Sequence, residues 1–123
     1  LVRQFRYAYG EELWEIPAGK LEKGEDPAVT AARELEEEAG FIPEKTELLY
    51  IIYPTPGYTN EKIYIYRAVG VREGHVHLDD GEYLTSAFFP LSKIGEMIER
   101  GEIRDAKTIV AVQRLLLERA QNK

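Results

Sequence analysis

The sequence predicts a single α/β domain in which short strands and helices follow one another along the chain. β-branched and aromatic residues are concentrated at 46–53 and 62–71, which is typical of strands. Ile109, Val112 and Leu116 recur at the spacing of one helix face. The 123 residues fit one domain of ordinary size and contain no internal repeat, linker or low-complexity segment. We therefore expect one mixed α/β domain.

The first 26 residues predict two short strands and a loop. Residues 1–9 and 13–16 read as strands, and the polar turn at 10–12 joins them. A loop punctuated by glycine and proline then runs from Pro17 to Asp26.

The next element is a well-marked helix. Asp26 is a favourable N-cap, Pro27 suits the first helical position, and Gly40 stands where a left-handed C-terminal cap would end the helix. The rest of the chain adds, besides the two strands named above, an irregular loop, a further strand and two closing helices, at 54–61, 84–89, 92–100 and 105–119.

The composition excludes several classes of protein. No cysteine is present, so disulfides, thiolate metal sites and cysteine nucleophiles are excluded. Apolar residues make up 44% of the chain, and no apolar run approaches the ~18 residues that a membrane-spanning helix requires. The 22 acidic and 16 basic side chains give a net charge of −6, which argues against nucleic acid as the main partner. If the ligand is phosphorylated, metal ions are a candidate for neutralising its charge.

Glu34, Glu37 and Glu38 give the predicted helix an acidic side. At about 100° per residue, these side chains fall within one sector about 100° wide. Each pair of like charges three or four residues apart costs about 0.2–0.5 kcal/mol, and Arg33 offsets part of that cost. Carboxylate oxygens clustered in this way suit a hard cation such as Mg²⁺ or Mn²⁺. The alternative interpretation is a solvated acidic helix face without a ligand.

Residues 19–41 resemble the signature of the Nudix hydrolase family. They read GKLEKGEDPAVTAARELEEEAGF and fill every fixed position of the pattern G-x5-E-x7-R-E-U-x-E-E-x-G-U, in which U is a bulky apolar residue. The resemblance implies an α/β/α sandwich with a mixed sheet, formed by residues 1–123 as one domain. It also implies divalent-metal-dependent hydrolysis of a nucleoside diphosphate linked to another moiety.

The same resemblance implies roles for individual residues. Glu34, Glu37 and Glu38 would be metal ligands, with Glu37 also counted among the catalytic residues. Arg33, also counted among the catalytic residues, would orient these carboxylates, and Glu25 would support the loop or join the metal shell.

Segments outside the signature resemble the ADP-ribose pyrophosphatase branch of the family. These segments are VRQFR at 2–6, EIPAG at 15–19, PTPG at 54–57, TNE at 59–61 and GEIRDAKT at 101–108. The branch implies cleavage of ADP-ribose to AMP and ribose 5-phosphate by attack of water on phosphorus.

The branch also implies further site residues. Ala18 would offer its backbone carbonyl to a metal, and Glu82, in an acidic loop, would be the general base that activates the water. Asp80 departs from the glutamate that is usual in that loop. The residues implied to contact substrate are Arg3, Arg6, Glu15, Pro56, Gly57 and Glu61.

Two other functions stay open at this point. One keeps the chemistry and changes the ligand to another nucleoside diphosphate sugar or a dinucleotide. The other is a Nudix-fold sensor that binds ADP-ribose without cleaving it, although the chain keeps every carboxylate of the signature.

The first residue is Leu1, and the chain begins inside a predicted strand. Since the branch usually carries additional N-terminal strands that two subunits exchange, we expect an upstream segment to be absent from this sequence. We also expect a homodimer in the cytoplasm that acts on a small nucleotide sugar, with neither nucleic acid nor membrane as partner.

Overall fold

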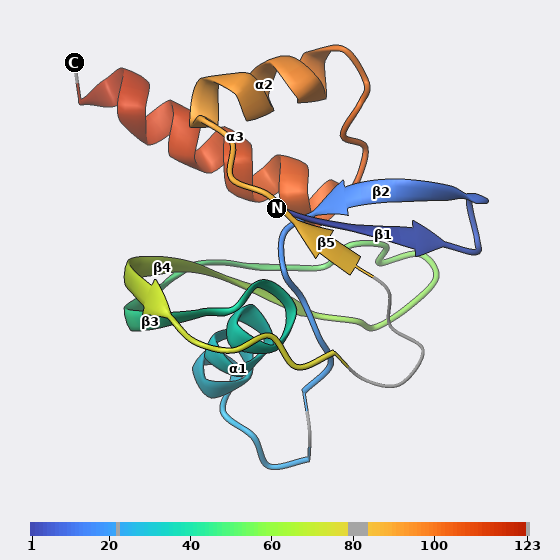
Figure 1. Ribbon diagram of the computed structural model, residues 1–123. Coiled ribbons are helices and arrows are strands. Elements are labelled where there is room, and N and C mark those ends of the chain that lie inside the picture. The colour runs from blue at the N-terminus through green and yellow to red at the C-terminus, as the bar shows by residue number, and fades with distance from the viewer. Residues whose placement is uncertain (22, 79–83, 123) are drawn as a thin grey trace. The chain divides into compact units, whose positions relative to one another are not determined.

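The computed structural model describes residues 1–21, 23–78 and 84–122, and five strands and three helices lie in these ranges (Figure 1). None of these helices has the length and apolar character needed to cross a bilayer. In chain order the elements are β1 (Val2–Arg6), β2 (Glu11–Glu15), α1 (Pro27–Ala39), β3 (Phe41–Ile52), β4 (Ile63–Glu73), β5 (Leu84–Ser86), α2 (Leu91–Glu99) and α3 (Ala106–Gln121).

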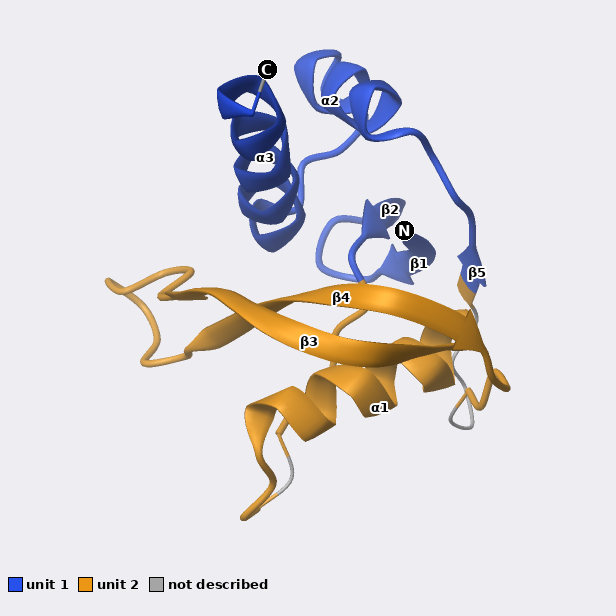
Figure 2. Cartoon of the chain, turned by 90° about the vertical axis from the view of Figure 1, so that its left-hand side faces the viewer, with its two compact units in different colours: residues 1–16, 85–123 blue, residues 17–84 orange. Residues whose placement is uncertain are grey.

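The chain divides into two compact units, which are described separately (Figure 2). Unit 1 consists of residues 1–16 and 85–123, and unit 2 consists of residues 17–84.

Unit 2 is a two-stranded antiparallel ribbon with a helix packed on it. β3 and β4 pair from Phe41 opposite Glu73 to Ile52 opposite Ile63, and α1 lies along this ribbon (Figure 2). Ile65 on β4 is 2% exposed and is the most buried apolar side chain among the described residues of the unit. The ribbon therefore supplies a surface against which α1 can bury one of its sides.

The predicted ends of α1 are confirmed. The Asp26 side chain accepts a hydrogen bond from the backbone N–H of Ala28 at 2.8 Å. Gly40 has φ +80°, and its N–H donates to the carbonyl of Glu36, which is the left-handed C-terminal cap that favours glycine. The helix is thus fixed in length and register by local contacts at both ends.

β3 begins at Phe41, five residues before the predicted start at Thr46. The chain leaves the Gly40 cap directly in extended conformation and pairs with the last residues of β4. Pro43, Glu44 and Lys45 have low intrinsic strand preference, but pairing with a partner strand outweighs it.

Unit 1 contains a three-stranded sheet in the order β2-β1-β5. β1 and β2 are antiparallel, with Val2 opposite Glu15 and Arg6 opposite Glu11. β1 ends at Arg6, short of the predicted Tyr9, because the N–H groups of Tyr9 and Gly10 both turn back to the carbonyl of Arg6.

The core of unit 1 lies where α2 and α3 meet. Ile94, Met97, Ile103 and Val112 form this core, and Leu1 and Phe89 are among the residues packed against it. Trp14 also packs there, with its ring edge-to-face with Phe89 at 5.2 Å between centroids. The helices close the chain as predicted, apart from shifts of one or two residues at their ends.

Glu15, at the end of β2, is a buried charge in unit 1. It is 2% exposed, and Arg6 donates to both of its carboxylate oxygens, through Nε at 2.7 Å and Nη2 at 2.8 Å. Lys107 Nζ adds a third bond at 2.7 Å. Burial raises the pKa of Glu15, but the hydrogen bonds from Arg6 and Lys107 outweigh burial and hold the pKa below its ordinary value.

The lowered pKa of Glu15 predicts how stability depends on pH. Ionised Glu15 stabilises the fold above its usual pKa of 4.5, and this contribution is lost as the pH falls through the lower pKa of the folded state. We expect Glu15→Gln to lower the free energy of unfolding by about 1–3 kcal/mol at pH 7, measured by urea denaturation.

The difference between wild type and Glu15→Gln should shrink as the pH falls below 4.5. Glu11→Gln, at an exposed position of the same strand, is the control and should change little at any pH. A difference for Glu15→Gln that stays constant from pH 7 to pH 3 would contradict this assignment.

Candidate functional site

The three carboxylates of the acidic side of α1 are shielded from solvent. Glu38 is 6% exposed, and the side chains of Glu34 and Glu37 are 16% and 30% exposed. Glutamates on a solvated helix face keep most of their surface in water. The interpretation of this side as a solvated face is therefore wrong, and the charges need partners within the protein.

Arg33 is the main partner of this acidic side. Its Nε and Nη2 atoms donate to the two carboxylate oxygens of Glu25 at 3.2 and 3.1 Å. Its Nη1 atom donates to Glu34 at 3.0 Å and to Glu37 at 3.2 Å. One guanidinium thus binds three carboxylates, one from the preceding loop and two from the helix.

These bonds also stabilise the charge of Arg33. The hydrogen bonds that Arg33 donates to Glu25, followed by the charges of Glu25, Glu34 and Glu37, raise the pKa of the Arg33 guanidinium above its ordinary value. Because the planar guanidinium presents several donors in a fixed arrangement, it orients the carboxylates as well as neutralising them.

The loop before α1 contacts two of the same carboxylates. The backbone N–H of Ala18 donates to Glu38 Oε2 at 2.8 Å. At Gly19, an added Cβ would lie 2.1 Å from Glu34 Cδ, so a side chain there would displace the Glu34 carboxylate. Residues 18 and 19 therefore bring bare backbone against the acidic side of the helix.

The donor set suits a hard divalent cation in its chemistry. Glu34, Glu37 and Glu38 offer only oxygen atoms, and the backbone at Ala18 and Gly19 lies beside them. Within residues 1–21, 23–78 and 84–122, no three carboxylate or imidazole groups surround a common point that would hold a metal ion. One oxygen of Glu34 and one oxygen of Glu37 accept hydrogen bonds from Arg33.

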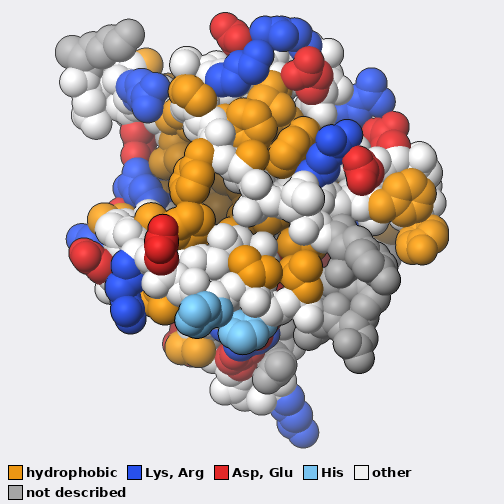
Figure 3. Space-filling model, in the orientation of Figure 1, with side chains coloured by type: hydrophobic (Ala, Val, Ile, Leu, Met, Phe, Trp, Pro, Cys, Tyr) orange, Lys and Arg blue, Asp and Glu red, His pale blue; other side chains and the backbone are white. Residues whose placement is uncertain are grey.

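Residues 74–77 run along the C-terminal end of α1. Gly74 N–H donates to the carbonyl of Gly40 at 2.8 Å, and His77 N–H donates to the carbonyl of Glu37 at 2.9 Å. The Glu36 carboxylate accepts from the backbone of His75 at 3.4 Å. Both imidazoles are exposed and lie side by side, as the pale blue side chains of Figure 3 show.

The predicted general base Glu82 and its neighbour Asp80 lie outside the described residues. The predicted substrate residues Pro56, Gly57 and Glu61 lie in the β3–β4 connection, where they are exposed. A turn shapes this connection, because Tyr58 and Thr59 N–H both donate to the carbonyl of Thr55.

The other predicted substrate residues belong to unit 1. Arg3 forms an ion pair with Glu12 at 3.0 Å, and its guanidinium lies 5.7 Å from the centre of the Trp14 ring. Arg6 and Glu15 bind each other, as described above. Their roles toward a substrate stay predictions.

Three residues of unit 1 lie around Glu15 and Ile16, although sequence analysis predicted no role for them: Asp105, Lys107 and Thr108. The role of Asp105 could have been predicted, because aspartate is a favourable N-cap residue. Asp105 caps α3 by accepting a hydrogen bond from the backbone N–H of Thr108 at 3.1 Å. The pairing of Lys107 with Glu15 could not be predicted from neighbouring residues, because the two are 92 residues apart.

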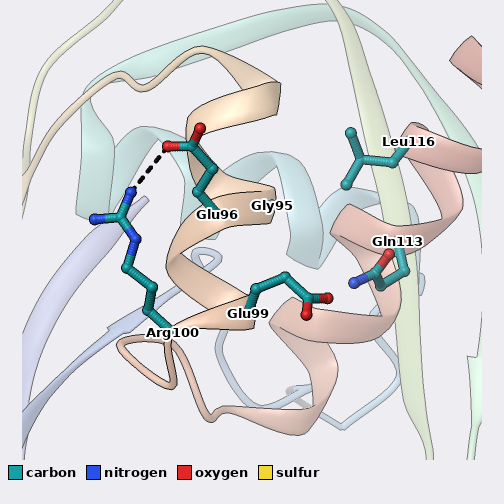
Figure 4. A pocket seen from close by; sticks show the side chains of 6 residues that line it. All are labelled: Gly95, Glu96, Glu99, Arg100, Gln113 and Leu116. Atoms are coloured by element: carbon teal, nitrogen blue, oxygen red, sulfur yellow. Dashed lines mark hydrogen bonds and ion pairs between the residues drawn. The ribbon is translucent and has the colours of Figure 1, made fainter.

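A hollow of about 470 Å³ lies between α2 and α3 in unit 1 (Figure 4). An ion pair between Glu96 and Arg100 at 3.0 Å lies at its side. The residues that line it are Gly95, Glu96, Glu99, Arg100, Gln113 and Leu116. None of them belongs to the acidic side of α1, so this hollow is separate from the candidate site.

Comparisons with known proteins place these features in a family. The profile of the NUDIX domain matches residues 1–113. The ADP-ribose pyrophosphatase of Bacillus subtilis is 39% identical over 122 residues, which are 98% of this chain and 66% of that protein. A protein of Bacillus methanolicus named methanol dehydrogenase activator is 43% identical with the same coverage.

The chain thus spans just under two thirds of the length of these relatives. A crystal structure titled ADP compounds hydrolase superposes with a TM-score of 0.85 at 23% identity, covering 98% of this chain and 65% of that one. This likeness confirms the predicted fold class. Because the NUDIX profile extends over residues 1–113 and includes the complete signature at 19–41, the chain belongs to the Nudix family.

Proposed function

We propose that this protein hydrolyses the pyrophosphate of ADP-ribose, giving AMP and ribose 5-phosphate. The observation that carries the proposal is the set of shielded carboxylates around Arg33, in a complete family signature. Acids that are largely shielded from water, two of them oriented by one guanidinium, are organised for binding, because solubility alone would favour exposed charges.

Glu34, Glu37 and Glu38, together with the backbone of Ala18, would hold a divalent cation. When bound, Mg²⁺ or Mn²⁺ neutralises the charge of the pyrophosphate and lowers the pKa of the attacking water. Without a cation, the acidic side of α1 would repel a doubly charged pyrophosphate. The net negative charge of the chain is therefore compatible with a phosphorylated substrate.

Other residues of the chain position the acids and activate the water. Arg33 holds the Glu34 and Glu37 carboxylates in place, and Gly19 leaves room for the Glu34 side chain. Glu82 would accept a proton from the water as its oxygen attacks phosphorus. The P–O bond of the pyrophosphate bridge then breaks, and the two products are phosphate monoesters.

The choice of ADP-ribose rests on relatives and on the segments outside the signature. The proteins of Bacillus subtilis and Mycobacterium tuberculosis that are named ADP-ribose pyrophosphatase are 39% and 36% identical to this chain. GDP-mannose pyrophosphatase of Escherichia coli is 35% identical over 127 residues, so another nucleotide sugar is the nearest alternative.

The substrate is tested by comparing kcat/KM for a panel in the presence of Mg²⁺. The panel contains ADP-ribose, ADP-glucose, GDP-mannose, FAD and diadenosine polyphosphates. We expect ADP-ribose to have the highest kcat/KM and AMP to be released in equal amount to ribose 5-phosphate. If another member were cleaved faster, the assignment to ADP-ribose would be wrong, and binding of ADP-ribose without any cleavage would indicate a sensor.

The roles of the acids are tested with amide variants that keep side-chain size. Glu37→Gln should lower kcat at least about 100-fold, because even residues that only support metal ligands cost 10- to 100-fold. Glu82→Gln should lower kcat about 10²- to 10⁴-fold, the usual contribution of a general base.

Glu36→Gln is the matched control, because Glu36 lies between the signature acids but is bonded to the backbone of His75. Its kcat should stay within about threefold of wild type. Wild-type rates for both Glu37→Gln and Glu82→Gln would show that the metal and base assignments are wrong.

A second candidate function comes from the 43% identical protein of Bacillus methanolicus, whose name states an action on another enzyme. The two candidates are separable, since hydrolysis needs only the small substrate, whereas activation needs methanol dehydrogenase in the assay. A homodimer in the cytoplasm stays a prediction, and light scattering of the purified protein tests the dimer.

A further inference from the structure

Lys107, the second residue of α3, binds the buried carboxylate of Glu15 within unit 1. Its Nζ atom donates to Glu15 Oε1 at 2.7 Å and to Asp105 Oδ1 at 3.1 Å. The side chains of Lys107 and Glu15 are 13% and 3% exposed, so water has little access to the bond between them. A shielded ion pair thus attaches the first turn of α3 to the end of β2.

The stability of α3 alone does not account for a lysine at this position. Asp105 already caps the helix by accepting a hydrogen bond from the backbone N–H of Thr108 at 3.1 Å. A positive charge in the first turn is unfavourable there, because the positive end of the helix dipole lies at the N-terminus. The contact of Lys107 with Glu15, beyond the helix, gives a lysine a reason to occupy this position.

The carboxylate that Lys107 binds also holds Arg6. Arg6 donates through Nε to Glu15 Oε2 at 2.7 Å and through Nη2 to Glu15 Oε1 at 2.8 Å. Such a two-point contact fixes the plane of the guanidinium. The Arg6 side chain is 42% exposed and that of Glu15 is 3% exposed. Arg6 is therefore the member of this pair that is accessible to a ligand.

A third contact changes what this ion pair can do. On its own, an ion pair restrains two side chains relative to each other, and both can still move together. Lys107 adds a restraint relative to α3, because it binds the same Glu15 oxygen that accepts from Arg6 Nη2. The orientation of the Arg6 guanidinium is then set by the sheet and by the helix of unit 1 together.

We propose that Lys107 is a positioning residue for Arg6: by holding the Glu15 carboxylate, it keeps the guanidinium oriented to bind an anionic group of the substrate. A planar guanidinium recognises phosphate through paired donors, so its orientation matters for binding. This gives a role to the segment at 101–108, which contains Lys107. The consequence for the substrate rests on the proposed function, whereas the consequence for Arg6 itself does not.

The test compares Lys107→Met, which removes the charge and keeps an unbranched side chain, with Lys107→Arg, which keeps a cation. Exchange of the Arg6 Nε–H with solvent, measured by NMR, reports on the bond to Glu15 without any substrate. Steady-state kinetics with ADP-ribose and Mg²⁺ gives KM and kcat separately. Lys93→Met, at an exposed lysine of α2, controls for the loss of one positive charge, and Val112→Ala controls for a general loss of stability.

For Lys107→Met, we expect exchange at Arg6 Nε–H to accelerate about three- to tenfold, the change that corresponds to one hydrogen bond. KM should rise by a similar factor while kcat changes little, because a loss of binding common to ground state and transition state raises KM alone. Lys107→Arg should recover most of both changes. Lys93→Met and Val112→Ala should leave the exchange rate and KM at the wild-type values, although Val112→Ala should lower Tm. If Lys107→Met does not fold, Lys107→Gln replaces it with the same expectations.

Three results would overturn the proposal. In the first, exchange at Arg6 keeps its wild-type rate in Lys107→Met, so Lys107 does not hold the pair, even if its charge affects KM. In the second, exchange accelerates and KM stays unchanged, so the orientation of Arg6 does not serve substrate binding. In the third, Val112→Ala changes exchange and KM as much as Lys107→Met, so the effect is a general loss of stability. If exchange at Arg6 responds as expected while ADP-ribose is not hydrolysed, the proposed function fails and the hold of Lys107 on Arg6 stands.

Discussion

Arg33 contacts three carboxylates, and this contact holds the loop before α1 against the helix. Desolvating a carboxylate without a partner costs several kcal/mol, and like charges placed a helical turn apart add to that cost. Arg33 offsets it at Glu25, Glu34 and Glu37, and the backbone N–H of Ala18 does so at Glu38. These bonds stabilise carboxylates that are largely shielded from water.

This constraint explains features at both ends of α1. The preceding loop must return to the helix to deliver Glu25 and the Ala18 N–H, and Gly19 permits the close approach. At the other end, β3 follows directly after the left-handed cap at Gly40, and α1 packs on the ribbon that β3 forms with β4. The same fold thus positions the acids and supports the element on which they stand.

Local signals in the sequence predicted much of this arrangement. Asp26 and Gly40 marked the ends of α1 because capping depends on a few neighbouring residues. The signature predicted which acids would cluster. Helix periodicity could not predict that Glu38 is buried or that Arg33 binds Glu25. Both depend on the path of the loop before α1.

Long-range contacts were the part that the sequence could not predict. Lys107 and Glu15 are 92 residues apart, and the same separation lies between Thr108 and Ile16. The early start of β3 was missed because strand pairing overrode the low preference of Pro43 and its neighbours. Arg6 and Glu15 were predicted as substrate contacts, and the structure adds that they bind each other, with the Glu15 carboxylate buried.

We propose that the shielded acids of α1 bind a divalent cation. Anomalous diffraction from crystals of the protein soaked in Mn²⁺ tests this proposal. We expect a manganese peak coordinated by oxygens of Glu34, Glu37 or Glu38, with the Ala18 backbone beside it. A peak only elsewhere on the chain, or no peak among these residues at a saturating Mn²⁺ concentration, would contradict it.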